Sequence, residues 1–143
     1  MKNYLILVLT CFIAFTNCSD NDAPAPVKIV EIYWSLTNVS GGITGTDEDF
    51  PLNTIKWRFD EVNNILNVEN DNTDDTKPDG LDSGDYDYSV LTENNQTFLV
   101  IDSNEIGRFT VTQTQLIIDE NDTSVGTGAD GYVYTFSKVT IVE

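Results

Sequence analysis

The residues of this chain with the greatest potential for chemistry are carboxylates. The chain has 143 residues, 24 acidic and 7 basic side chains, no histidine and two cysteines, and its net charge is −17. Without histidine it has no serine–histidine or cysteine–histidine nucleophile pair and no imidazole metal ligand. No pair of acids stands out as buried, so we predict that the protein is not an enzyme. We also exclude nucleic acid as a partner, because this charge repels phosphates.

An acid-rich segment is the one place where a metal ion could bind. Eight acidic side chains lie between Glu69 and Asp87. Calcium takes roughly six to eight oxygen ligands, but the spacing of an EF-hand loop is not met here. We therefore interpret the segment as a solvated loop and predict no metal and no cofactor. The alternative that stays open is a calcium site formed by Asp71, Asp74, Asp75 and Asp79.

Aromatic side chains recur at alternate positions in several segments, which is the spacing of one face of a strand. If they all point to the inside of one sheet, two interpretations stay open. They either fill the core, or they line an apolar ligand pocket in which tyrosine hydroxyls supply polar contacts. The residues concerned are Trp34, Trp57, Phe59, Tyr86, Tyr88, Tyr132, Tyr134 and Phe136.

The elements that would position these aromatics are strands. Alternating apolar residues predict eight strands, no sustained helical period is present, and short polar breaks between strands are typical of hairpins. We therefore predict an all-β fold, an antiparallel eight-stranded up-and-down barrel that removes exposed edges, with a two-sheet β-sandwich as the alternative. The predicted strands are 32–36, 55–59, 65–68, 85–90, 98–101, 106–111, 116–118 and 132–136, with longer loops at 70–84 and 120–131.

The start of the chain has the pattern of a secretory signal. A basic residue, Lys2, precedes an apolar run from Tyr4 to Phe15, which is shorter than the roughly 20 residues of a membrane-spanning helix. The sequence Phe15-Thr16-Asn17-Cys18 resembles a bacterial lipoprotein signal, in which cleavage precedes a cysteine that is then lipidated. This resemblance implies a lipid anchor at Cys18; ordinary secretion is the alternative.

These patterns divide the chain into three parts: a signal peptide at 1–17, a lipidated cysteine with an acidic and Ala-Pro linker at 18–27, and a barrel domain at 28–143. The acidic segment that begins at Cys18 resembles the signal that directs lipoproteins of Bacteroidota to the outer face of the outer membrane. The resemblance implies a lipid-anchored, cell-surface protein. Retention on the periplasmic side and secretion are the alternatives.

The order of motifs in the barrel domain resembles the small lipocalin-like lipoproteins of Bacteroidota, over roughly residues 28 to 139. The resemblance implies a cell-envelope protein that binds a small apolar or amphipathic ligand at the barrel mouth. A non-enzymatic interaction or structural module with a filled barrel, facing an envelope protein or a glycan, is the alternative. The motifs are Trp34, Trp57-Arg58-Phe59, Gly84-Asp85-Tyr86-Asp87-Tyr88, Thr114-Gln115-Leu116 and the segment from Tyr132 to Lys138.

Overall fold

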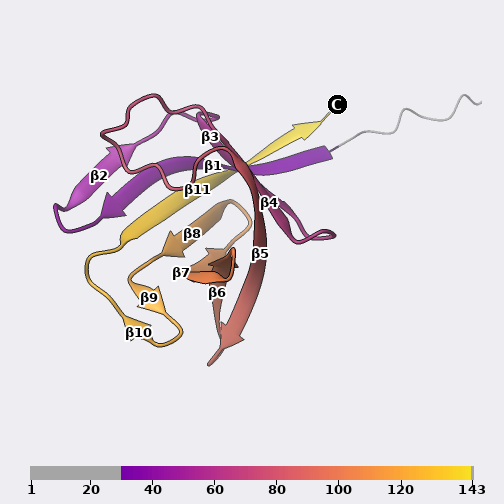
Figure 1. The fold of residues 1–143 in the computed structure, drawn as a ribbon. Helices are drawn as coiled ribbons and strands as arrows, with labels where there is room; N and C mark the ends of the chain where they lie inside the picture. Colours follow the sequence, from indigo (N-terminus) through magenta and orange to yellow (C-terminus); the bar gives the residue numbers. More distant parts are fainter. Residues whose placement is uncertain (1–29, 143) are drawn as a thin grey trace, which may run out of the picture.

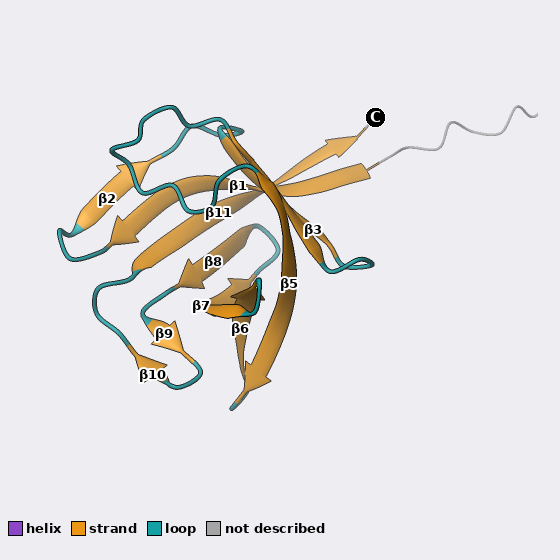
Figure 2. Ribbon diagram, viewed as in Figure 1, coloured by secondary structure: helices purple, strands orange, loops and turns teal. Residues whose placement is uncertain are grey.

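The computed structural model describes residues 30–142, and all regular structure in this range is strand (Figure 2). Eight strands form a closed antiparallel barrel, which confirms the predicted fold; the β-sandwich alternative is wrong. None of the described residues forms a helix that could cross a bilayer. The strands are β1 (Val30–Gly41), β2 (Thr46–Asp49), β3 (Ile55–Asp60), β4 (Ile65–Asn70), β5 (Gly84–Glu93), β6 (Gln96–Ile101), β7 (Asn104–Val111), β8 (Gln115–Asp119), β9 (Asp122–Thr123), β10 (Gly126–Thr127) and β11 (Tyr132–Val142).

The barrel closes between its first and its last strand. The sheet runs in the order β11-β8-β7-β6-β5-β4-β3-β1, and β11 pairs back to β1. This last ladder extends from Val30 opposite Val142 to Gly41 opposite Tyr132, and Figure 1 shows the two strands side by side. Because both outer strands are paired, the barrel strands have no free sheet edge in the region of this ladder.

Alternation along each strand places the large apolar side chains inside. Leu36, Leu66, Leu116 and Phe136 are fully buried. The ring of Trp57 lies with its centre 4.9 Å from that of Phe136, in the middle of the barrel. Side chains thus fill the middle of the barrel, as is usual for eight strands.

Three short strands were not predicted. β2 adds to β1 beyond the end of β3, and β9 pairs with β10 in a small hairpin. The segment that follows β2 covers the outer face of β1, where Asn53 donates its backbone N–H to Ser35 Oγ at 2.8 Å and accepts a hydrogen bond from the Tyr33 hydroxyl at 2.9 Å. Ser35 and Tyr33 point outward and are nevertheless buried, because this segment lies over them.

The two ends of the barrel are different. We call one end the mouth; it carries residue 30, residue 142 and the turns β3–β4, β5–β6 and β7–β8. At the other end, residues 71–83 between β4 and β5 form a segment that we call the strap. Leu81 of the strap packs against the core, and Lys77 Nζ lies 2.8 Å from Glu48 Oε2 on β2. The strap covers the closed end, whereas no comparable segment of the described chain covers the mouth.

Replacement of Trp57 tests whether side chains fill the middle of the barrel. Trp57→Ala is expected to lower the free energy of unfolding by about 3–5 kcal/mol, because it leaves a cavity beside Phe136. Urea denaturation followed by circular dichroism measures the change. Val62→Ala is the control, since Val62 is 90% exposed and its replacement should stay within about 0.5 kcal/mol of the wild type. A loss below about 1 kcal/mol for Trp57→Ala would contradict the filled middle.

Candidate ligand-binding cavity

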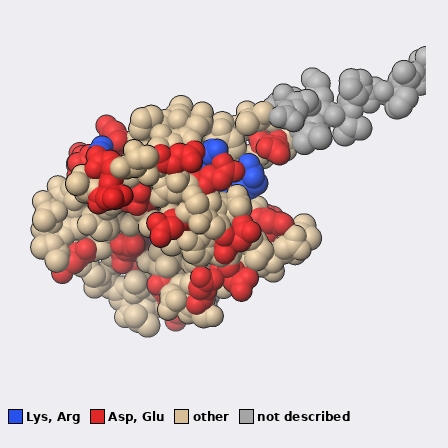
Figure 3. Space-filling view, turned by 45° about the horizontal axis from the view of Figure 1, so that its top comes forward, with Lys and Arg blue, Asp and Glu red and all other residues tan. Residues whose placement is uncertain are grey.

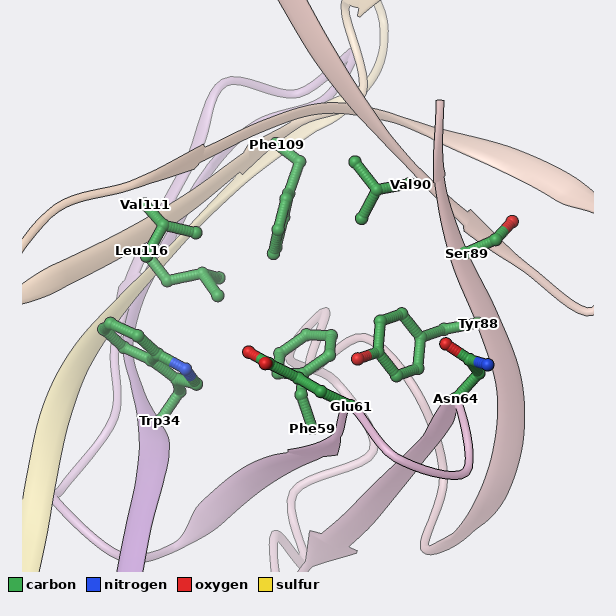
Figure 4. A pocket seen from close by; sticks show the side chains of 10 residues that line it. All are labelled: Trp34, Phe59, Glu61, Asn64, Tyr88, Ser89, Val90, Phe109, Val111 and Leu116. Atoms are coloured by element: carbon green, nitrogen blue, oxygen red, sulfur yellow. The ribbon is translucent and has the colours of Figure 1, made fainter. Parts of the chain in front are cut away.

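A cavity of about 400 Å³ opens at the mouth of the barrel (Figure 4). Its volume lies in the range of roughly 300–1,000 Å³ that is usual for small-molecule sites. Strands β1, β3, β5, β7 and β8 and the β3–β4 turn contribute to its wall. The lining residues are Trp34, Phe59, Glu61, Asn64, Tyr88, Ser89, Val90, Phe109, Val111 and Leu116.

The cavity lies beside the part of β5 that does not pair with β4. Residues 84–87 pair with β4, whereas residues 88–93 pair with β6. The N–H of Tyr88 still donates to the carbonyl of Asn64 at 3.0 Å, and beyond this bond β5 and the β3–β4 turn separate. Ser89 and Val90 therefore border an opening instead of continuing the ladder with β4.

Aromatic rings form the floor of the cavity. The ring of Phe59 meets that of Tyr88 edge-on, with their centres 5.0 Å apart, and lies 5.7 Å from that of Phe109. The ring of Trp57, 6.4 Å from that of Phe59, lies deeper in the barrel. This stack separates the cavity from the filled middle, so a ligand at the mouth would rest on an apolar surface that packing holds in place.

A few polar groups converge on this apolar space. Figure 4 shows the Glu61 carboxylate, the Tyr88 hydroxyl and the indole nitrogen of Trp34 directed toward the cavity. Glu61 takes part in no ion pair within residues 30–142. Partial burial raises the pKa of Tyr88, and the negative charges of Glu61 and Asp60 raise it further. The hydroxyl therefore stays protonated at neutral pH, when it can both donate and accept a hydrogen bond.

The rim around the cavity is also apolar. Most of the exposed large hydrophobic side chains in the described part of the chain lie at the mouth, on the ends of β1 and β11, on the β3–β4 turn, and on β5 and β7. Exposed apolar groups that gather in one place mark a surface that contacts a ligand or partner. They are Val30, Ile32, Val62, Val90, Leu91, Val111 and Ile141.

A second, smaller cavity of about 90 Å³ lies under the strap. Trp57, Tyr134 and Gly80 are among the residues that line it, and the indole N–H of Trp57 has no hydrogen-bond acceptor within residues 30–142. Burial, and then the charge of Glu120, raises the pKa of the Tyr134 hydroxyl. The space suits a few water molecules and not a drug-sized ligand.

The structure divides the aromatic residues that the sequence singled out. All eight belong to one apolar cluster. Trp34, Phe59 and Tyr88 line the mouth cavity, whereas Trp57 and Tyr134 line the small cavity under the strap. The remaining three, Tyr86, Tyr132 and Phe136, line neither cavity. Core filling and pocket lining are thus both present, in different parts of the barrel.

Several residues that line the mouth cavity were not predicted as site residues. Glu61 and Asn64 were predicted only as parts of a turn, and Val90, Phe109 and Val111 only as parts of strands. A signal for Glu61 was present, because it continues the alternation of Trp57 and Phe59 by one more position. Val90 likewise follows Tyr88 at an alternate position of the same strand. Which end of the barrel stays open could not be read from this alternation.

The four candidate calcium ligands of the acid-rich segment are not gathered in the structure, and the calcium alternative stays a prediction. Nowhere in residues 30–142 do three His, Cys, Asp or Glu side chains gather as metal ligands would. Asp79 accepts hydrogen bonds from the side-chain amides of Asn70 and Asn72, at 3.1 and 2.8 Å. Asp74 accepts from the hydroxyl and the N–H of Thr76, and these bonds lower its pKa. The carboxylates therefore stabilise the strap itself.

The proposed lipid anchor, Cys18, lies outside the described residues.

The raised pKa of Tyr134 predicts a loss of stability in alkali. The unfolded chain releases the phenol proton near pH 10, while the folded chain retains it, so stability is complete below about pH 10 and falls as the pH rises further. Tyr134→Phe has no such proton and is expected to lose less stability than the wild type between pH 9 and pH 11. Urea denaturation at both pH values measures the difference, and equal losses in the two proteins would contradict the burial of this hydroxyl.

The barrel was compared with known proteins at three levels. No protein-family model, no curated protein and no solved structure matches this chain. Its fold is a closed antiparallel β-barrel with a cavity at its mouth.

Proposed function

We propose that the protein is a non-enzymatic binding module of the cell envelope, which takes a small apolar or amphipathic ligand into the mouth cavity. The observation that carries this proposal is an open cavity of about 400 Å³ with an aromatic and aliphatic wall and few polar groups. Apolar surface that is removed from water on binding supplies the free energy, and the closed barrel holds the wall in place beforehand.

The rival function is an interaction or structural module whose partner is an envelope protein or a glycan. The exposed apolar rim favours it, because such a rim would also suit contact with another macromolecule. It needs no cavity, however, because side chains can fill the mouth of a barrel that serves only as a scaffold. The two functions differ in whether a ligand binds in the cavity.

We further propose that the protein is one of the small lipocalin-like lipoproteins, anchored in the outer membrane through Cys18 and exposed at the cell surface. Secretion, or an anchor that faces the periplasm, is the alternative. The described chain begins at Val30, at the same end of the barrel as the cavity. An anchor at Cys18 would therefore tether the mouth end, and amphipathic molecules concentrate at membranes.

A series of n-alkanols tests the binding function. Each methylene that enters the cavity contributes about 0.8 kcal/mol, so affinity should rise about fourfold per carbon and level off once the cavity is full. Isothermal titration calorimetry of the full-length protein measures this series. Val90→Trp and Val111→Trp, which place a bulky ring in the cavity, should abolish the dependence on chain length.

The control for these variants is Val125→Trp, because Val125 is 95% exposed and lies in the β9–β10 connection, away from the mouth. This variant should bind as the wild type does. Binding by residues that precede the barrel would be equal in all variants, so only the difference between them reports on the cavity. Equal affinities in all four proteins would contradict the binding function and favour the interaction module.

The anchor is tested by removing the cysteine that would carry it. In the cells of origin, the wild type should incorporate a fatty-acid analogue and sediment with membranes, because several acyl chains hold a protein firmly on a bilayer. Cys18→Ala should lose the label and move to the soluble fraction. A wild-type protein without label, or a Cys18→Ala protein that retains the label, would contradict lipidation at this residue.

A further inference from the structure

The charge inside the mouth cavity is of one sign. Among the ten lining residues, Glu61 is the only one that carries a charge at neutral pH, and no lysine or arginine is among them. Asp60 adds a second negative charge next to the entrance, and both charges raise the pKa of the Tyr88 hydroxyl. The face of the molecule seen in Figure 3 likewise carries far more acidic than basic side chains. A carboxylate or phosphate head in this cavity would be repelled by the negative charges of Glu61 and Asp60.

The walls offer what a cation needs. Aromatic faces attract ammonium groups through the negative charge of the ring face, and four rings, those of Trp34, Phe59, Tyr88 and Phe109, border the cavity. Trp34 already shows this behaviour, since Lys138 Nζ lies 5.8 Å from the centre of its ring. The Glu61 carboxylate and the Tyr88 hydroxyl are directed toward the same space and supply a counter-charge and a hydrogen-bond partner (Figure 4).

We propose that the cavity is specific for amphiphiles with a positively charged head, such as an alkylammonium group. The aliphatic chain lies against Phe109, Val111 and Leu116, and the head lies between the Glu61 carboxylate and the ring of Tyr88. This specificity rests on the proposed binding function, because it describes the ligand of the same cavity. It adds the sign of the ligand's charge, which the cavity volume alone does not determine.

The alternative ligand is an anionic amphiphile. Two basic side chains near the mouth, Lys138 and Arg58, would favour it. Lys138 does not line the cavity, and its ammonium group lies over the Trp34 ring. Arg58 faces Glu31, with Nη2 3.8 Å from Oε2. Each is thus engaged with another group, whereas Glu61 has no ion pair within the described range. This difference favours a cationic head.

Three probes with the same chain test the proposal: decyltrimethylammonium and decyl sulfate, each below its critical micelle concentration, and decanol below its solubility limit. Calorimetric titration of the full-length protein gives the affinity, and circular dichroism confirms that it remains folded. The wild type is expected to bind the cation more tightly than decanol and decyl sulfate least. Glu61→Gln should weaken binding of the cation about three- to tenfold and leave decanol unchanged.

The matched control is Glu93→Gln, which removes the same charge from the β5–β6 hairpin at the mouth without touching the cavity. It should change the affinity for the cation less than about twofold, since exposed charges outside the site are screened by salt. An equal effect of Glu61→Gln and Glu93→Gln would show attraction by net charge alone and overturn the proposal. If decyl sulfate binds most tightly of the three probes and Lys138→Gln abolishes this binding, the cavity is specific for anionic amphiphiles and the proposal is wrong.

Failure of the inference and failure of the proposed function give different results. If decanol binds, Val111→Trp prevents it, and the cation shows no advantage that depends on Glu61, the cavity is a ligand site without charge specificity. If Val111→Trp affects none of the three probes, the cavity is not a site for such amphiphiles, and both proposals fall together.

Discussion

The ladder between β1 and β11 is the constraint on which the rest of this structure depends. It joins the first and last strands along their whole length, from Val30 opposite Val142 to Gly41 opposite Tyr132. Without it the sheet would have two long open edges, and its inward-facing aromatics would face water. One irregularity at Thr37 interrupts the register, and there the threonine hydroxyl donates to the carbonyl of Thr135 at 2.9 Å. The barrel therefore closes despite this local change of register.

Closure creates an interior, and the size of the side chains determines how much of it stays empty. In the middle, Trp57 and Phe136 with the surrounding leucines fill the space. Toward the mouth, the β4–β5 ladder ends at Asp87, and a cavity remains between the later part of β5 and the β3–β4 turn. Toward the other end, the strap returns to the core and leaves only a small cavity. One closed sheet thus has a covered end and an open end.

The acidic side chains have different roles at the two ends. In the strap, carboxylates such as those of Asp74 and Asp79 accept hydrogen bonds from neighbouring polar groups, which shape the loop. At the mouth, the Glu61 carboxylate has no ion pair in residues 30–142 and points toward a cavity that aromatic rings line. A dense acidic run is therefore a poor guide to chemistry here, whereas one acid that lines an apolar cavity carries the proposed specificity.

The sequence by itself determined the all-β class, the eight barrel strands and their antiparallel order, because alternation and short polar turns are local properties. It also singled out eight aromatics of the apolar cluster, although not Phe50 and Phe109. Only the tertiary structure decided which of them line a cavity, because Trp34, Phe59, Tyr88 and Phe109 come together only when the barrel closes. The same holds for the burial of Tyr33 and Ser35, which depends on a segment that folds back over them. The open mouth lies where the β4–β5 ladder ends, and the end of a ladder leaves no trace in the pattern of any single strand.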